Sequence, residues 1–272
     1  MSDKYLSCSI VVPIYKSQPS LLELTSIYQT FKILANFDFA IVCPKGLDIS
    51  YYETLAKQFG ISIRIIRLSK KNFASISGYN KLMLSATFYK KFKHYTSILI
   101  CQLDAYVFRD ELDYWVSQGY DYIGAPWFSS DNPKEGLPHF LGIGNGGFSL
   151  RNIQSHLKAL NQFSYIISPY TIIKAFTYKP SFGTFWNMIR DLTIGNNSHY
   201  LLGKSEINED VFWGSVIKRN YPWFKAPDMI TAAKFATETN AEKIYNLMNQ
   251  KLPFGCHGWD KYDTAFWSKH IL

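Results

Sequence analysis

Cysteine is scarce in this sequence and never occurs in a closely spaced pair. The four cysteines form no CxxC motif and lie far apart in the chain, at Cys8, Cys43, Cys101 and Cys256. No signal-peptide pattern precedes the first predicted strand. We therefore expect free thiols and a cytoplasmic location.

Long apolar runs and charged residues are scarce as well. No run approaches the roughly 20 apolar residues that a membrane-spanning helix needs, so we expect no transmembrane segment. Charged residues make up 18% of the chain and apolar residues 47%, which argues against disorder and favours a large core. Internal repeats, low-complexity segments and Pro- or Ser-rich linkers are absent, so we expect one domain over residues 1–272.

The net charge of +8 predicts an anionic partner, which is nucleic acid, an anionic membrane face or a phosphorylated ligand. Lysine and arginine are spread along the chain, with only short clusters such as Lys70-Lys71 and Lys90-Lys91. Because neither a basic arm nor a recognition helix stands out, we expect no nucleic-acid partner. Aromatic residues make up 17% of the chain, and their flat faces with polar edges suit sugar rings as well as a core.

The first part of the chain alternates between β-branched runs and stretches of helical spacing. The predicted strands are Ser9–Tyr15, Asp38–Cys43, Ile61–Leu68 and Thr96–Leu103, and the predicted helices are Ser20–Leu34, Tyr51–Phe59 and Ile76–Phe92. This alternation predicts an α/β fold with a mainly parallel sheet, in which ligands bind outside the carboxyl ends of the strands. Tyr15, Pro44 and Asp104 then lie on one rim of the sheet.

The regular alternation fails after Gly119, where segments rich in glycine and aromatic residues take over. We expect the second part to build the site. The single domain then has a nucleotide-binding half of about residues 8–118 and a donor-sugar and acceptor half of about residues 119–272.

Asp104 is the first candidate for chemistry, because it emerges from the apolar run Thr96–Leu103. A carboxylate in that position is costly without a partner. A Mg²⁺ or Mn²⁺ ion bound by carboxylates and phosphate oxygens would supply one. A helix N-cap, or an ion pair with Arg109, would supply one equally well.

Other residues have properties that suit a nucleotide-sugar site. In the segment Asn145-Gly-Gly-Phe-Ser149 two small residues allow close approach of a ligand to the backbone. Trp127 and Trp259 are candidates for stacking on a sugar or a base, and the candidates for phosphate contacts are Lys81, Arg151 and Lys261. No GxGxxG fingerprint of dinucleotide binding opens a helix after a strand.

Seven segments occur in an order that resembles a family of small GT-A-type glycosyltransferases of bacteria and large viruses. They are Ser9-Ile-Val-Val-Pro-Ile-Tyr15, Gly78-Tyr-Asn80, Gln102-Leu-Asp104, Gly124-Ala-Pro-Trp127, Asn145-Gly-Gly-Phe-Ser-Leu-Arg151, Glu209-Asp-Val-Phe-Trp213 and His257-Gly-Trp259. The resemblance runs from about Ser9 to Trp267. The chain is also more distantly similar to the β-1,4-galactosyltransferases.

The resemblance implies a GT-A-like fold and a role for each motif. Asp104 becomes the last residue of an Asp-x-Asp motif whose first position holds Gln102, and His257 becomes the second metal ligand. An inverting transfer needs one general base, which the resemblance assigns to Glu209 or Asp210, and we favour Asp210. The residues expected to bind the nucleotide sugar are Pro13, Tyr15, Asn80, Lys81, Gln102, Asp104, Trp127, Asn145, Gly146, Gly147, Trp259 and Lys261.

The resemblance implies a metal-assisted, inverting transfer from a UDP-sugar to a glycan or lipid-linked glycan, with Mn²⁺ or Mg²⁺ as cofactor. A sugar nucleotidyltransferase is one alternative, but such enzymes need a glycine-rich loop after the first strand, and Pro13–Pro19 contains no glycine. A binding module that has lost turnover is the other, because Gln102 leaves a single carboxylate. The aromatic stretch Tyr165–Tyr178 and the positive charge also predict peripheral contact with the inner membrane face.

Overall fold

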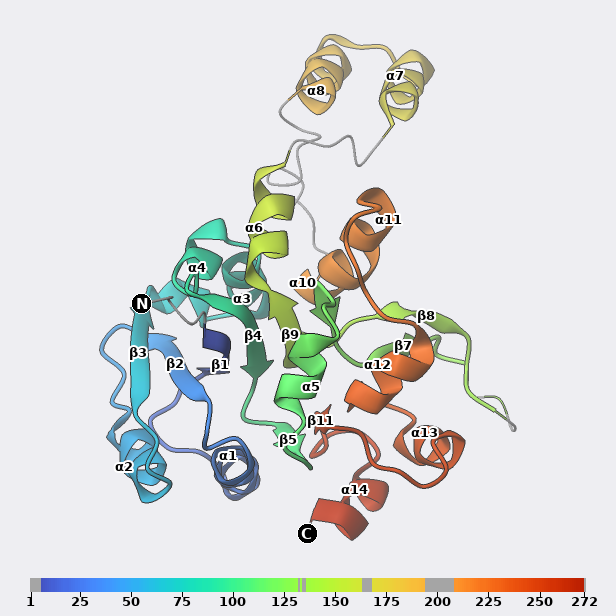
Figure 1. Cartoon of the computed structure of the whole chain (residues 1–272). Coiled ribbons are helices and arrows are strands. Elements are labelled where there is room, and N and C mark those ends of the chain that lie inside the picture. Colours follow the sequence, from blue (N-terminus) through green and yellow to red (C-terminus); the bar gives the residue numbers. More distant parts are fainter. Residues whose placement is uncertain (1–5, 132, 134–135, 163–167, 194–207, 272) are drawn as a thin grey trace.

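The structure is a computed structural model that describes residues 6–131, 133, 136–162, 168–193 and 208–271. Six strands form the main sheet in the order β3-β2-β1-β4-β9-β6 (Figure 1). Their bounds are β1 Leu6–Pro13, β2 Asp38–Pro44, β3 Ile63–Leu68, β4 Tyr95–Cys101, β6 Tyr122–Ile123 and β9 Phe148–Asn152. β1 is parallel to β2 and β4, and β2 to β3, whereas β9 is antiparallel to β4 and β6. The predicted α/β fold with a mainly parallel sheet is confirmed.

Helices flank this sheet, and short strands add two smaller sheets. The helices beside the first four strands are α1 Leu21–Ile33, α2 Ser50–Gln58, η1 Lys70–Asn72, α3 Ile76–Met83, α4 Ala86–Lys90, α5 Leu112–Ser117 and α6 Ile153–Asn161. Later helices are α7 Pro169–Tyr178, α8 Phe182–Leu192, α10 Glu209–Val211, the π-helix η3 Phe212–Ile217, α11 Lys218–Asn220, α12 Met229–Phe235, α13 Ala241–Leu247 and α14 Thr264–Ile271. The short strands are β5 Ala105–Val107, β7 Pro126–Phe128, β8 Phe140–Ile143, β10 Ala236–Thr237 and β11 Gly255–His257.

The prediction of one helix over Ile76–Phe92 is wrong, because the chain forms two helices there. The first helix ends where the Leu84 N–H donates to the Asn80 carbonyl and the Ser85 N–H donates to the Leu82 carbonyl. The second bond spans three residues instead of four, which tightens the last turn. α4 then starts after Ser85, which is its N-cap residue.

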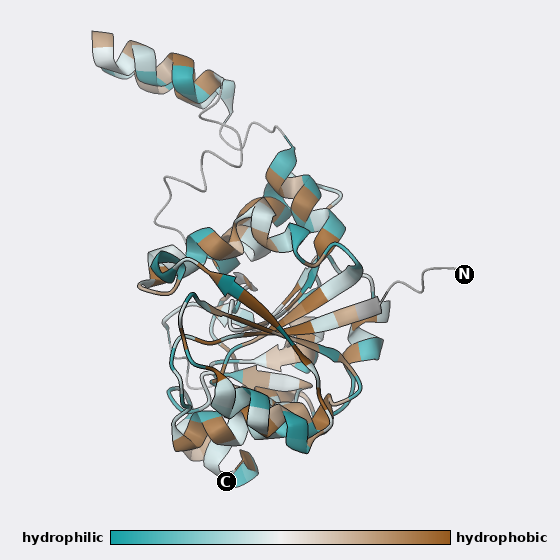
Figure 2. Cartoon of the chain, turned by 90° about the vertical axis from the view of Figure 1, so that its left-hand side faces the viewer, coloured by the Kyte–Doolittle hydropathy of each residue, from teal (hydrophilic) through white to brown (hydrophobic). Residues whose placement is uncertain are grey.

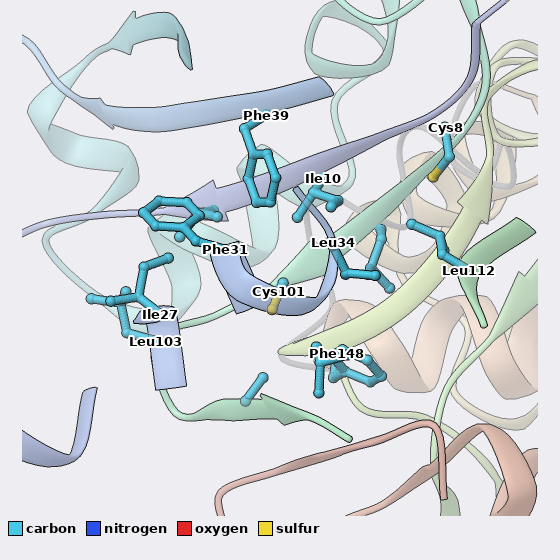
Figure 3. Packing of buried hydrophobic residues seen from close by; sticks show 14 of the residues in the cluster. Cys8, Ile10, Ile27, Phe31, Leu34, Phe39, Cys101, Leu103, Leu112 and Phe148 are labelled. Carbon is cyan, nitrogen blue, oxygen red and sulfur yellow. The ribbon is translucent and has the colours of Figure 1, made fainter. Parts of the chain in front are cut away.

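Both faces of the main sheet are covered by apolar side chains. On one face Ile10 of β1 lies in the same core cluster as Phe31 of α1 and Phe39 of β2 (Figure 3). On the other face the neighbouring Val11 lies with Phe88 of α4. Burial on both faces explains why the inner strands β1, β2 and β4 read as nearly unbroken apolar runs, and brown segments mark apolar residues in the sheet in Figure 2. The edge strand β3 is partly exposed and contains Arg64 and Arg67. The four cysteines are free, as predicted, and all four are buried.

The strand order reverses between β1 and β4, because β2 and β3 extend the sheet on one side of β1 and β4 lies on the other. In open α/β sheets, ligands bind at such a switch point, outside the carboxyl ends of the strands. β1 ends at Pro13 and is followed by Ile14 and Tyr15, and β4 is followed by Gln102–Asp104.

A three-stranded sheet in the order β10-β11-β5 carries the C-terminal part of the chain to this switch point. β5 directly follows Asp104, and its antiparallel register with β11 pairs His257 with Ala105. No helix in the described part of the chain has the length and apolarity of a membrane span.

Candidate active site

A cleft of about 700 Å³ lies at the switch point between β1 and β4. Most of the residues predicted to form the site line it, although they come from distant parts of the chain. These residues are Pro13, Tyr15, Asn80, Gln102, Asp104, Gly146, Gly147, Glu209, Asp210, His257 and Lys261. A smaller cavity shares Tyr15 with this cleft and is lined by Pro44, so the predicted rim of the sheet forms one continuous surface.

Asp104 and His257 lie side by side because of the pairing between β5 and β11. The Gly258 N–H donates to the Asp104 carbonyl over 2.9 Å, which fixes the two segments at this point. Nε2 of His257 lies 3.2 Å from Oδ1 of Asp104. This Nε2 atom is buried and forms no hydrogen bond of suitable geometry. A nitrogen and a carboxylate oxygen therefore converge on the cleft.

Glu238 completes this group, although it was not among the predicted site residues. It follows β10, and because Thr237 pairs with Cys256 it comes next to His257. Its Oε1 lies 2.9 Å from Nδ1 of His257, and its Oε2 accepts a hydrogen bond of 3.3 Å from Nε1 of Trp127. No motif marks Glu238, since only the strand register reveals its position.

The charges around the imidazole shift the pKa values of the group. Burial alone lowers the pKa of His257, but the carboxylates of Asp104 and Glu238 outweigh burial and raise it to about 9. Burial alone raises the pKa of Asp104, but His257 and Lys261 outweigh that and hold it below its usual range. Without a bound cation, a protonated His257 and the Lys261 ammonium therefore neutralise Asp104.

The donor set at this point fits a divalent cation in its chemistry. Asp104 offers an oxygen, and the buried Nε2 of His257 lacks a hydrogen-bond partner. Within the described residues, no three His, Cys, Asp or Glu side chains form a group that could hold a metal ion. Two protein ligands leave positions for phosphate oxygens and water, which Mg²⁺ usually keeps. Lys261 contacts Oδ2 of Asp104, and its side chain is 58% exposed, so it is free to swing away.

The glycine turn before β9 lies against this group. Asn145 adopts a left-handed conformation, with φ of 77°, and its Oδ1 accepts hydrogen bonds from the N–H groups of Gly147 and Phe148. A Cβ atom at Gly147 would lie 2.0 Å from Nε2 of His257, and one at Gly146 would lie 2.3 Å from Oε1 of Glu209. Both glycines are therefore required by packing within the site. Asn145 is buried and does not line the cleft, so it shapes the turn without facing a ligand.

Glu209 forms a buried ion pair with Arg151, and both of its oxygens accept guanidinium N–H bonds of 2.8 Å. Arg151 also donates to the Ser149 hydroxyl and to the Tyr89 hydroxyl. The prediction that Arg151 contacts phosphates is therefore wrong, since its side chain is fully buried. Burial raises the pKa of Glu209, and the guanidinium opposes this shift.

Asp210 differs from its neighbour because none of the described lysine or arginine side chains forms an ion pair with it. Its Oδ2 accepts a hydrogen bond of 3.1 Å from the Gly146 N–H, and its Oδ1 accepts one of 2.8 Å from the Val211 N–H. Burial raises the pKa of Asp210, although these two N–H groups lower it. The carboxylate thus lies in the cleft as a positioned proton acceptor with raised affinity for a proton.

Asn80 lines the cleft and bonds the residues at the start of α10, the helix that carries Asp210. Its amide donates to the Asn208 side chain over 3.0 Å and accepts a hydrogen bond from the Glu209 N–H. It therefore helps to fix the segment that carries Asp210.

Of the remaining predicted ligand residues, Trp259 is corrected by the structure, whereas Trp127 and Lys81 lie outside the lining of the cleft, and one alternative is also corrected. Trp259 is buried, and its Nε1 donates to the Ser26 hydroxyl over 2.8 Å, so it cannot stack on a ligand. Trp127 packs over Gly144 and bonds Glu238 outside the cleft lining. Lys81 is exposed and does not line the cleft. The alternative pairing of Asp104 with Arg109 is wrong, because Arg109 pairs with Glu111.

Comparison with known proteins gives one family and several distant structural likenesses. The model of the family described as Protein of unknown function (DUF5672) matches residues 62–257. No curated protein sequence matches the chain.

Many solved structures are similar to the chain, and three of them show the degree of likeness. Core-mannan synthase A (CmsA/Ktr4) from Aspergillus fumigatus in its Mn/GDP form shares 8% identity at a TM-score of 0.45, over 78% of this chain and 69% of that one. The glycosyltransferase GlyE of Streptococcus pneumoniae shares 10% identity at a TM-score of 0.48. The match covers 98% of this chain, but only 60% of the GlyE chain. TarS 1–349 of S. aureus shares 11% identity at a TM-score of 0.38, over 75% of this chain and 67% of the TarS chain. At these values the likenesses assign no substrate.

Proposed function

This chain belongs to the family described as Protein of unknown function (DUF5672), and we propose that it is a glycosyltransferase using a nucleotide diphosphate sugar. The observation that carries the proposal is one cleft at a topological switch point lined by Asp104, His257 and Asp210. A carboxylate–imidazole pair suits a cation and a diphosphate, and a separate carboxylate suits proton transfer from a hydroxyl group.

The diphosphate of the donor, which we propose to be a UDP-sugar, binds beside Asp104, His257 and Lys261. Asp104 and His257 would hold a Mn²⁺ or Mg²⁺ ion, and the ion would neutralise the charge that develops on the leaving diphosphate. Lys261 supplies a second positive charge at the same place, and its exposed stem allows the ammonium group to move from Asp104 to a phosphate oxygen. Gly146 and Gly147 line the cleft, and their lack of side chains lets Glu209 and His257 lie against the turn beside the donor.

Asp210 acts as the general base in this proposal. The acceptor hydroxyl oxygen attacks the anomeric carbon, the bond from that carbon to the diphosphate oxygen breaks, and the hydroxyl proton passes to Asp210. The Gly146 and Val211 N–H groups hold the carboxylate in place. Attack from the side opposite the diphosphate inverts the anomeric configuration. The acceptor is a glycan or lipid-linked glycan of a surface polysaccharide, and the setting is the cytoplasm, where the four thiols stay reduced.

Incubation with a panel of nucleotide sugars and Mn²⁺ tests the proposal directly. We expect slow release of free nucleotide from one donor, faster with the correct acceptor, and loss of release when the metal is chelated. Binding of a nucleotide sugar without any release would instead identify a non-catalytic module.

Asp104→Asn is expected to remove Mn²⁺-dependent binding of UDP while the fold stays intact. The change removes the anionic ligand and keeps the shape of the side chain, and a disturbed metal site typically loses about tenfold to 100-fold in affinity or more. Isothermal titration calorimetry with UDP and Mn²⁺ measures the effect. Asp110→Asn, an exposed aspartate a few residues further along, is the matched control and should bind as the unmodified protein does. Equal affinity in the Asp104 variant would refute the metal assignment.

Glu238→Ala is expected to weaken Mn²⁺ binding by about tenfold to 100-fold, although Glu238 is not a ligand. Its carboxylate holds Nδ1 of His257, which leaves Nε2 for the cation. Glu238→Gln keeps an oxygen for the Nδ1–H bond and should recover much of the affinity. At saturating Mn²⁺ the kcat of both variants should approach the normal value. Exposed Glu242→Ala on α13 is the control, and a kcat loss that Mn²⁺ does not restore would contradict the positioning role.

A further inference from the structure

The hairpin of α7 and α8 stands apart from the sheet and its flanking helices in both views of the molecule (Figures 1 and 2). Each helix begins at a serine N-cap. Ser168 accepts a hydrogen bond from the Thr171 N–H, and Ser181 forms a reciprocal capping box with Thr184. Such caps stabilise helices that receive little support from tertiary packing.

The hairpin carries apolar side chains that nothing in the described structure covers. In α8 the residues Phe182, Phe185, Trp186 and Ile189 follow the spacing i, i+3, i+4, i+7 and form one stripe, yet all four are exposed. Phe176 of α7 contacts Phe185 at 6.0 Å between ring centroids, so the two helices meet at one edge of this stripe. The most exposed aromatics flank the turn of the hairpin, with Tyr178 at 84% and Phe182 at 81%.

The charges on the hairpin are mainly positive. Residues 168–193 contain three basic side chains and one acidic side chain. The acidic Asp191 pairs with Arg190 over 2.8 Å. Lys174 and Lys179 remain as exposed cations, and Lys179 lies at the turn between Tyr178 and Phe182.

We propose that the α7–α8 hairpin, the segment from Pro169 to Leu192, docks on an anionic lipid surface. Amphipathic helices with aromatic residues on one face and basic residues beside them lie in the membrane interface, where Trp and Tyr rings match the polar headgroup layer. Tyr178 and Phe182 enter this layer at the turn, and Lys179 meets the lipid phosphates. The positive charge of the whole chain acts in the same direction.

A second copy of the chain fits the hairpin less well than a lipid surface does. Two copies of the chain each carry a net charge of +8 and repel one another, whereas an anionic lipid surface attracts the same charge. At such a surface apolar insertion of the rings and charge attraction of the lysines act together.

The position of the hairpin in the chain connects it with the cleft. It is inserted between α6, which follows the β9 strand of the glycine turn, and α10, which carries Asp210. A membrane-bound hairpin would bring the cleft near an acceptor held by lipid. The docking itself does not depend on the proposed glycosyl transfer, since vesicle binding can be measured without any substrate.

Sedimentation of the full chain with lipid vesicles tests this inference. With phosphatidylcholine and phosphatidylglycerol in equal parts we expect binding that salt weakens, and with phosphatidylcholine alone we expect little binding. The triple variant Tyr178→Ser, Phe182→Ser, Trp186→Ser is expected to bind at least about tenfold more weakly, and the double variant Lys174→Glu, Lys179→Glu is expected to lose the dependence on anionic lipid.

The controls are Leu21→Ser and Tyr114→Ser, which remove exposed apolar side chains outside the hairpin and should bind as the unmodified chain does. Circular dichroism checks that every variant is folded. Absence of binding to anionic vesicles at low salt would overturn the inference, and so would unchanged binding of the triple variant. Analytical ultracentrifugation adds a third decisive outcome. If the unmodified chain is a dimer and the triple variant is a monomer, the hairpin binds a second copy of the chain and the inference is overturned.

Discussion

Asp210→Asn is expected to lower kcat by about 10²-fold to 10⁴-fold with donor affinity nearly unchanged, because that is the usual loss for removing a positioned general base. The amide cannot accept the hydroxyl proton, whereas the shape of the side chain and the Gly146 contact are largely kept. Steady-state kinetics with the donor found in the nucleotide-sugar panel measures the effect. The product should have inverted anomeric configuration, and a retained configuration would exclude the role of Asp210 as the base.

The pH dependence gives a second signature of the same residue. Because burial raises the pKa of Asp210, kcat of the unmodified protein should fall as the pH drops through that raised value, and the Asn variant should lack this limb. A carboxyl whose pKa is raised by folding destabilises the native state when it is ionised, and stability is gained as pH falls through the folded-state pKa. The lost activity would therefore not arise from loss of a stabilising charge.

Asp228→Asn is the matched control for this variant. Asp228 caps α12 through a hydrogen bond from the Thr231 N–H, and Asn caps helices about as well as Asp does. Its kinetics should match those of the unmodified protein. Normal turnover in the Asp210 variant would show that the Glu209-Asp210 pair only begins a helix.

The first four strands were predictable because their signals are local. An apolar, β-branched run predicts a strand without any information on the strands beside it. The alternation of such runs with helices implies parallel pairing and a rim of the sheet where Asp104 emerges. The strand ends differ by a few residues from the prediction, and the largest error in this part concerned Ile76–Phe92. Helical spacing continues through Leu84, but one tightened turn at Ser85 ends the first helix, and periodicity does not register such a turn.

The second part of the site depends on pairings between distant residues. His257 reaches Asp104 through the register of β5 with β11, and Glu238 reaches His257 through the register of β10 with β11. These strands have only two or three residues each, too few for a period to be recognised. Trp259 was misassigned for a related reason, since it was expected to stack on a ligand and instead bonds Ser26 in the interior.

The role of Arg151 was misassigned. A basic residue near a glycine turn looks the same in the sequence whether its side chain faces a phosphate or a buried carboxylate. Its partner Glu209 lies 58 residues further along the chain. Burial decides between the two roles, because a guanidinium that is fully enclosed and bonded by both carboxylate oxygens has no room for a ligand. The acidic pair thereby divides into a structural Glu209 and an available Asp210.

Glu209→Gln is expected to lower the free energy of unfolding by about 3 to 5 kcal/mol, because it leaves the Arg151 guanidinium buried without its counter-charge. For a chain of this size the melting temperature should fall by roughly 6–20 °C. Urea denaturation followed by circular dichroism measures the change. The double variant Arg151→Met, Glu209→Leu should recover much of the stability, since a buried ion pair is often replaced by apolar residues of similar volume at little cost.

The matched control is Glu111→Gln, which breaks the exposed pair between Glu111 and Arg109. That pair is also an arginine with a glutamate, joined over 2.7 Å, but solvent screens it and its loss should cost less than about 1 kcal/mol. The contrast between the two variants isolates burial as the cause. If Glu209→Gln instead keeps full stability and abolishes turnover, then Glu209 is the base, and the division of roles between Glu209 and Asp210 must be reversed.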